Sequence, residues 1–267
     1  MNKETYFENI KTYKLLANKS LGQNFLINSS FAEKFVDLLE LEDGDNVLEI
    51  GAGLGSLSYF LAEHKSHSTL IDVDERMLSY LQSQFGNKNN VEIKRENILK
   101  SDLTSYSKII GNLPYYITSG IIEHILTNAV NAKKIVLMCQ KEVYPKLLKD
   151  YVSPLSLLLN YVCDISSPIN VGRNNFTPVP HVDSVVFTLT PNENIKKAEN
   201  KKLLKLMQQL FLHRRKTILN CLQTITKDKT AAEKALNELK VSTVLRPEQL
   251  PINFYIELLN FIKFKNF

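Results

Sequence analysis

The chain has 267 residues, 44% of them hydrophobic, which is enough for one domain of ordinary size and a smaller second domain. Its start lacks the basic and then apolar layout of a signal peptide, and its most apolar stretch, 155–162, is too short to cross a bilayer, so we expect a cytoplasmic protein without a membrane span. The net charge is +5, but residues 191–267 hold 15 basic and 7 acidic residues while residues 1–190 sum to −3, a surplus that favours an anionic partner such as nucleic acid.

Seven short runs rich in apolar and β-branched residues predict strands along the first 190 residues. They lie at 47–50, 69–73, 91–93, 108–111, 135–138, 161–169 and 185–189. Helical spacing appears before the first strand, after the second and after the fourth, in the groups Phe31, Phe35, Leu38 and Leu39; Met77, Leu78 and Leu81; and Ile121, Ile122 and Ile125. Strands that alternate with helices predict an α/β fold with a seven-stranded, Rossmann-like parallel sheet covered on both faces.

The last part of this region departs from the alternation. No helical pattern separates the last two strands, and Gly172, Pro178 and Pro180 mark the intervening segment as a loop, so we expect an antiparallel pair at the sheet edge. After Leu189, a polar linker at 191–194 leads into a helical pattern with the apolar stripe Leu203, Leu206, Met207 and Leu210. We therefore predict a first domain at 1–190 and a small, basic, all-α domain at 191–267.

A glycine-rich turn, LEIGAGLG at 48–55, follows the first strand. Gly51 and Gly53 allow the backbone to approach a ligand closely, and the start of the next helix offers free amides. Asp72 ends the second strand, 21 residues after Gly51, where a carboxylate can accept hydrogen bonds from both ribose hydroxyls. The pattern indicates a nucleoside cofactor, although a tight turn between strand and helix would use the same glycines.

Two kinds of nucleoside cofactor are open at this point. A dinucleotide fingerprint requires a further glycine where this chain has Ser56, because the helix must pack closely beneath a pyrophosphate. The serine favours a cofactor without phosphate, such as S-adenosylmethionine. The loop alone does not decide between them.

The segment Asn112-Leu113-Pro114-Tyr115 ends the fourth strand, at the carboxyl edge where open α/β sheets bind ligands. The N6 amine of adenine is a poor nucleophile because its lone pair is delocalised into the ring. The Asn112 side-chain carbonyl and a backbone carbonyl beside Pro114 can accept the amine hydrogens, and Tyr115 can stack on the base. Methyl transfer then depends on alignment of the amine nitrogen with the methyl group of the donor, rather than on a strong base. A strand-ending turn with a core tyrosine is the alternative interpretation.

Several segments in this order resemble those of the KsgA-type ribosomal RNA adenine dimethyltransferases, over about residues 18–220. They are GQNFL at 22–26, the glycine loop, NLPY at 112–115, QKEV at 140–143, FTPVP at 176–180 with VDS at 182–184, and RRKT at 214–217. The family also contains macrolide-resistance methyltransferases and mitochondrial transcription factor B. The resemblance implies a class I methyltransferase sheet, S-adenosylmethionine as cofactor, and N6,N6-dimethylation of two adjacent adenosines in small-subunit (16S) rRNA.

The resemblance also implies roles for single residues. Gln23, Asn24 and Leu26 would contact the cofactor, the first two at its methionine end, together with Gly51, Gly53, Asp72, Asn97 and Asn112. The target adenosine would be flipped out of an RNA loop onto Asn112, Leu113, Pro114 and Tyr115, with Phe176 opposing Tyr115 across the base. Taken singly, Phe176 could instead be a core anchor, and Gln23 and Asn24 loop or helix-cap residues. The chain departs from the family at Asp72, where glutamate is usual, at Asn97, where an acid would contact the adenine, and at His181, where lysine is common.

Two further functions stay open: methylation of large-subunit rRNA, as in the macrolide-resistance enzymes, and nucleic-acid binding without catalysis. The NLPY and VDS segments favour the small-subunit branch. We therefore expect the partners to be small-subunit rRNA and an immature 30S-type subunit, and the chain to act as a monomer. Three scattered cysteines and five scattered histidines predict neither a disulfide nor a metal site.

Overall fold

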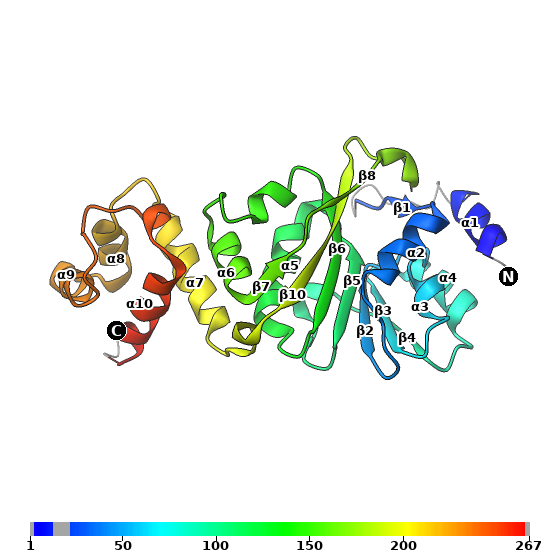
Figure 1. Cartoon of the computed structure of the whole chain (residues 1–267), viewed down its shortest axis with the longest axis horizontal. Coiled ribbons are helices and arrows are strands. Elements are labelled where there is room, and N and C mark those ends of the chain that lie inside the picture. Colours follow the sequence, from blue (N-terminus) through cyan, green and yellow to red (C-terminus); the bar gives the residue numbers. More distant parts are fainter. Residues whose placement is uncertain (1–2, 13–21, 265–267) are drawn as a thin grey trace. The chain divides into compact units, whose positions relative to one another are not determined.

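The computed structural model of the chain describes residues 3–12 and 22–264 (Figure 1). These residues fall into two compact units. The first runs up to Pro145 and continues over Cys163–Asn192, and the second comprises Lys146–Val162 and the chain from Glu193 onward.

The first unit is built on one mixed sheet. Its strands are β2 (Asn46–Ile50), β3 (His67–Asp72), β4 (Val91–Arg95), β5 (Lys108–Asn112), β6 (Lys134–Gln140), β7 (Cys163–Ile165), β8 (Ile169–Val171) and β10 (Ser184–Pro191). Their order is β4-β3-β2-β5-β6-β10-β7, with β8 also paired to β10. Strands β2 to β6 are parallel, whereas β10 runs antiparallel to β6, β7 and β8.

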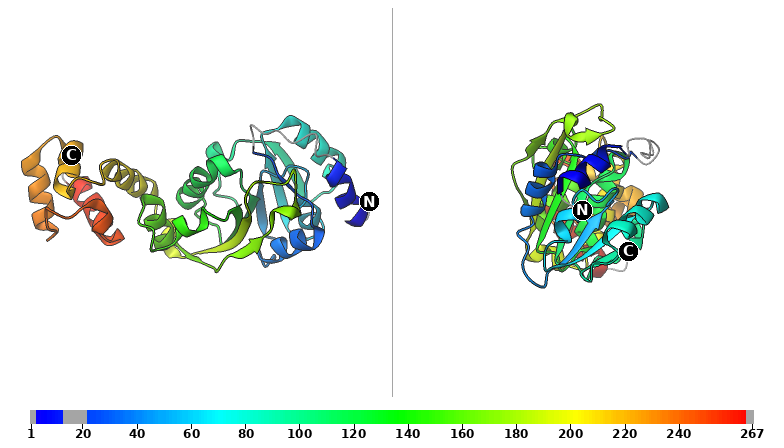
Figure 2. Two further views of the ribbon diagram at one scale, coloured as in Figure 1. Left: turned by 90° about the horizontal axis from the view of Figure 1, so that it is seen from above. Right: turned by 90° about the vertical axis from the view of Figure 1, so that its right-hand side faces the viewer.

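Helices α1 (Lys3–Thr12), α2 (Ser29–Asp37), α3 (Ser58–Leu61), α4 (Glu75–Phe85) and α5 (Thr118–Asn128) belong to the same unit. Alternate strand positions face opposite sides of the sheet. Val47 and Ile110 form one core with α2 and α4, while Leu48 and Ile109, on the other face, are equally buried. Both faces are therefore covered, as a parallel sheet requires. Helix α1 lies beside α2 in the views of Figures 1 and 2.

A second, two-stranded sheet joins distant parts of the first unit. Strand β1 (Phe25–Leu26) pairs antiparallel with β9 (Phe176–Thr177), which places Leu26 opposite Phe176. The Ile27 amide extends this pairing by donating to the Asn175 carbonyl at 2.8 Å. The segment before α2 is thereby fastened to the segment before β10.

The second unit is helical over its described residues. Its elements are α6 (Pro154–Val162), α7 (Asn200–Phe211), α8 (Ile218–Thr226), α9 (Lys229–Glu238) and α10 (Ile252–Phe264). The expected stripe is present in α7, where Leu203, Leu206, Met207 and Leu210 are all buried. Lys201, Lys202 and Lys205 lie on the exposed side of the same helix.

The predicted fold class is confirmed: the five parallel strands and the antiparallel last strands form a Rossmann-like sheet. The prediction of one strand at 161–169 is wrong. Residues up to Val162 end α6, and β7 and β8 are two short strands separated by 166–168. The apolar run 155–162 forms a helix because its buried side chains pack on α7. Residues 146–162 thus belong to the second unit, although the sequence placed them in the first domain.

Candidate functional site

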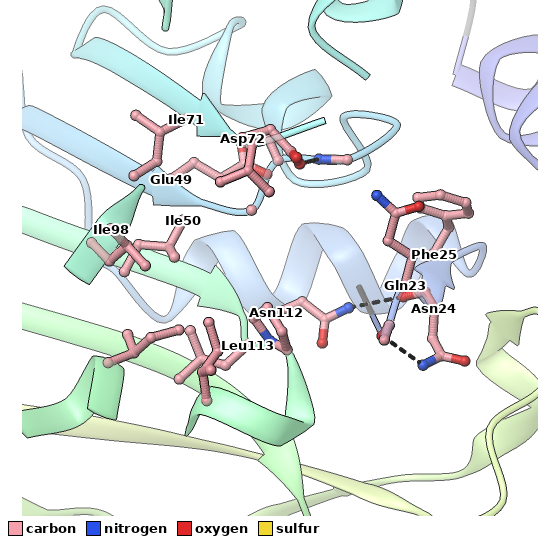
Figure 3. A pocket seen from close by; sticks show the side chains of 18 of the residues that line it. Gln23, Asn24, Phe25, Glu49, Ile50, Ile71, Asp72, Ile98, Asn112 and Leu113 are labelled. Carbon is pink, nitrogen blue, oxygen red and sulfur yellow. Dashed lines mark hydrogen bonds between the residues drawn. The ribbon is translucent and has the colours of Figure 1, made fainter. Parts of the chain in front are cut away.

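A cavity of about 290 Å³ lies at the carboxyl ends of β2, β3 and β5 (Figure 3). Open α/β sheets bind their ligands at this edge. The cavity is lined by the segments 22–26, 49–54, 56–57, 71–73, 96–99, 112–117 and by Ile121. Apart from Phe176, every residue that the sequence marked as catalytic or cofactor-binding lies in this lining.

The glycine turn forms one wall of the cavity and has the backbone shape that glycine permits. Gly51, Gly53 and Gly55 have φ angles of 67°, 54° and 75°, all in the left-handed region. A Cβ on Gly53 would stand 3.2 Å from the Phe25 ring. The turn is therefore tightly packed as well as sharply bent.

Helix α1 fixes the same turn from behind. The Tyr6 hydroxyl donates to the carbonyl oxygens of Leu54 at 2.6 Å and Gly55 at 3.2 Å. The Tyr6 ring is almost fully buried and packs near Phe7 and Phe85. The N-terminal helix is thus a structural part of the glycine turn.

Asp72 lies at the end of β3 with its carboxylate in the cavity wall. One oxygen accepts the Gly53 N–H and the other accepts the Asp74 N–H, each at 2.9 Å. Burial raises the pKa of Asp72 above its usual range, against the opposing effect of these hydrogen bonds. A carboxylate offers about four acceptor positions, so acceptor capacity remains for a ribose hydroxyl.

Glu49, in β2, is a second buried acid in the wall, and no role for it was predicted. Ser58 donates its hydroxyl to Glu49 Oε2 at 2.6 Å. Burial, reinforced by the nearby charge of Asp72, raises the pKa of Glu49 to about 8. Among the described residues neither acid has a salt-bridge partner. The lining formed by the described part of the chain contains these acids and no Lys, Arg or His, so the cavity fits a sulfonium cofactor better than an anionic pyrophosphate.

Asn112 ends β5 and has a fixed side-chain orientation. Its Nδ2 donates to the Asn24 backbone carbonyl at 3.1 Å, as the dashed line in Figure 3 marks. The donor end of the amide is therefore engaged, which leaves the Oδ1 acceptor for a ligand. Beyond it, the Thr118 hydroxyl donates to the Pro114 carbonyl at 3.0 Å and holds the turn that leads into α5.

Gln23 and Asn24 are held by local hydrogen bonds. Gln23 Nε2 donates to Asp74 Oδ2 at 3.2 Å, and Asn24 Nδ2 donates to the Gly22 carbonyl at 3.1 Å. Asp74 also pairs with Arg76 at 2.6 Å, and this pair holds the pKa of Asp74 below its usual range. The segment before β1 is therefore attached to the start of α4.

Asn97 and Tyr115 lie at two other parts of the wall. Asn97 is exposed, and its Oδ1 accepts the Leu99 N–H at 3.0 Å as the cap of a short helical turn. Tyr115 is half-buried, and its hydroxyl lies 3.3 Å from Ser184 Oγ. Burial raises the pKa of the Tyr115 phenol, so it is neutral near pH 7.

Phe176 is the one predicted site residue that lies elsewhere. Its side chain is 1% exposed and belongs to the core with Leu26, its partner across the two strands. It does not line the cavity in this structure. The proposed contact with a target base stays a prediction. A signal for Glu49 is present in the sequence, because it is an acid within the otherwise apolar run 47–50.

Two absences concern the described part of the chain. Residues 3–12 and 22–264 include no helix long and apolar enough to cross a membrane and no cluster of three potential metal-ligating acids, histidines or cysteines. Cys139, Cys163 and Cys221 are buried and free.

Comparison with known proteins gives consistent matches over most of the chain. Residues 14–263 match the family described as ribosomal RNA adenine dimethylase. Ribosomal RNA small subunit methyltransferase A of Levilactobacillus brevis is 36% identical over 94% of this chain and 92% of its own length, and its namesake in Mycoplasma capricolum is 36% identical over 94% and 99%. A dimethyladenosine transferase of Plasmodium falciparum has a TM-score of 0.74 at 26% identity, over 90% of this chain and 97% of that one. The 23S rRNA methyltransferase ErmE has the same fold, with a TM-score of 0.62 at 23% identity, over 90% and 100% of the two chains.

Proposed function

Because the chain belongs to the ribosomal RNA adenine dimethylase family, we propose that it methylates N6 of two adjacent adenosines in a hairpin loop of small-subunit (16S) rRNA, giving N6,N6-dimethyladenosine. S-adenosylmethionine is the methyl donor of this family. The observation that carries the proposal is the geometry of Asn112, whose amide nitrogen is bound to Asn24 and whose oxygen is left to accept a hydrogen of the target amine.

The residues of the cavity divide between the two ligands. Asp72 would hold the ribose of the cofactor, and the backbone of the glycine turn would lie against the cofactor. Gln23 and Asn24 would contact its methionine end, and Leu26 would also contact the cofactor. Asn97 would face the adenine, with the Nδ2 that its capping bond leaves available. When bound, S-adenosylmethionine supplies an electrophilic methyl group on a sulfonium.

The chain's own contribution is to orient the target amine. At the first transfer, Asn112 Oδ1 and the backbone carbonyl between Leu113 and Pro114 would accept the two N6 hydrogens and direct the nitrogen lone pair at the methyl group. The N–C bond would replace the S–C bond and one N6 proton would pass to solvent, which leaves one hydrogen for these acceptors at the second transfer. Tyr115 stacks on the adenine face from its half-buried position. No strong base is required, because alignment and fixed dipoles supply most of the acceleration.

The relatives named above favour the small subunit over the large. The two small-subunit enzymes are 36% identical to this chain, whereas ErmE is 23% identical and shows the fold alone. A nucleic-acid-binding factor without catalysis would not need Asn112, Pro114 and Tyr115 together in the cavity wall, where all three are present in this chain. We expect the chain to act as a monomer, in the cytoplasm, on an immature 30S-type subunit.

The test is methyl transfer from labelled S-adenosylmethionine to immature small and large subunits, with the modified bases mapped. Asn112→Ala should lower turnover by about 100-fold or more while cofactor affinity by calorimetry changes little. Asn87→Ala, an exposed asparagine outside the cavity, is the matched control. Transfer to the large subunit alone would reject the proposed substrate, and a normal single-turnover rate for Asn112→Ala would reject the role of that side chain.

A further inference from the structure

Tyr116 is an aromatic residue with an unusual environment. It follows Tyr115 in the short helical turn Tyr115–Ile117, and both tyrosines line the cavity. Tyr115 is half-buried with its hydroxyl near Ser184, but Tyr116 is 62% exposed and has no hydrogen bond to another described residue. Single exposed apolar side chains are common, but a ring this exposed at the rim of a ligand cavity indicates a binding surface.

The ring of Tyr116 is supported on one side and open on the other. A Cβ on Gly22 would stand 3.6 Å from Tyr116 Cδ1, so one edge of the ring lies close to Gly22. Gly22 belongs to the segment whose Asn24 carbonyl fixes Asn112. The aromatic surface therefore lies beside the residues that would hold the target amine, and its exposed part faces solvent.

We propose that Tyr116 is a stacking platform for the nucleotide next to the target adenosine. This proposal rests on the proposed function, in which an adenosine leaves its stack to enter the cavity. Flipping that base leaves its neighbour without a stacking partner, and the neighbour must lie near the cavity rim because the backbone connects the two. An exposed aromatic ring at the rim replaces the lost stacking, and any base presents a suitable π face.

The position of Tyr116 at the cavity rim also affects how the two adjacent adenosines can be methylated in turn. The two target adenosines are adjacent, so each is the other's neighbour. When one occupies the cavity, the other can lie on Tyr116 without the RNA leaving the protein. The platform therefore favours two adjacent unstacked bases over a single flipped base.

The test compares Tyr116→Phe, Tyr116→Leu and Tyr116→Ala. The probe is an RNA hairpin with two adjacent loop adenosines, the flanking one replaced by the fluorescent analogue 2-aminopurine. Tyr116→Phe keeps the π face and should bind and quench as the wild type does. Leucine and alanine should weaken hairpin binding by about 5-fold to 150-fold and abolish the quenching, with S-adenosylmethionine affinity unchanged.

Three outcomes would overturn the platform. Hairpin affinity equal to the wild type in Tyr116→Ala would remove the ring from the RNA contact. Wild-type behaviour of Tyr116→Leu would show that apolar bulk suffices. An equal loss of cofactor affinity would assign the ring to the cofactor wall. The proposed function is tested separately, by methylation of small subunits with the wild type. If the wild type does not methylate them while Tyr116→Ala still weakens hairpin binding, the proposed function is rejected and the nucleotide-binding role of Tyr116 is kept.

Discussion

Glu49→Gln should change the pH dependence of stability. The folded protein holds a proton on Glu49 up to about pH 8, whereas the unfolded chain releases it near pH 4.5. Because the folded state binds the extra proton between these values, its free energy of unfolding falls as the pH rises through this window. The difference of 3.5 pH units corresponds to about 5 kcal/mol, or roughly 1.4 kcal/mol per pH unit.

Glutamine keeps the acceptor for the Ser58 hydroxyl but cannot lose a proton. Urea unfolding from pH 5 to 8.5 should therefore show similar stability for both proteins near pH 5, and a growing advantage of Glu49→Gln toward pH 8. Glu142→Gln, at an exposed acid, is the control and should follow the wild type. Parallel curves for the wild type and Glu49→Gln would refute the assignment of a buried, protonated acid at this position.

Three further predictions concern ligand binding. Asp72→Ala should weaken S-adenosylmethionine binding at least 10-fold by calorimetry, because both ribose hydroxyls lose a charged acceptor; unchanged affinity in folded protein would mean that the ribose is held elsewhere. Tyr6→Phe should weaken cofactor binding about 5-fold, because the hydrogen bonds to the glycine turn are lost. Tyr59→Phe, in the same aromatic cluster, is the control and should leave cofactor affinity unchanged. Equal losses of cofactor affinity in the two variants would show that Tyr6 acts through packing alone. Charge reversal at Lys201, Lys202 and Lys205, all exposed on α7, should weaken RNA binding and flatten its salt dependence while sparing the cofactor, and an unchanged slope would remove them from the RNA interface.

Much of the fold could be predicted from the sequence because its signals are local. The parallel strands contain short runs rich in apolar and β-branched residues, and α2, α4 and α5 show apolar residues at helical spacing, so composition and periodicity indicated the same elements. The run 155–162 is short and has only two polar residues, Ser156 and Asn160, so helix and strand could not be separated there. Its state is decided by packing on α7, which lies some 40 residues later in the chain.

The site could be predicted where its residues belong to motifs at strand ends, because the carboxyl ends of parallel strands meet at one edge. Gly51, Asp72 and Asn112 follow three neighbouring strands and meet in one cavity. The sequence could not reveal that Tyr6 supports the glycine turn, since the contact joins a terminal helix to a backbone carbonyl and has no residue pattern. Nor could it decide between a core position and a base contact for Phe176, because the core position depends on pairing with Leu26.

The pairing of β1 with β9 also has a consequence for synthesis. Leu26 and Phe176 are 150 residues apart, and a ribosome adds roughly 5–20 residues per second, so the partner of β1 emerges about 8–30 s after it. The glycine turn and Asn112 are both synthesised within that interval. The nascent chain therefore holds most of the cavity wall before residues 22–26 can be fastened in place. Ribosome-bound chains stalled before residue 176 should bind S-adenosylmethionine more weakly than chains stalled after β10 has emerged.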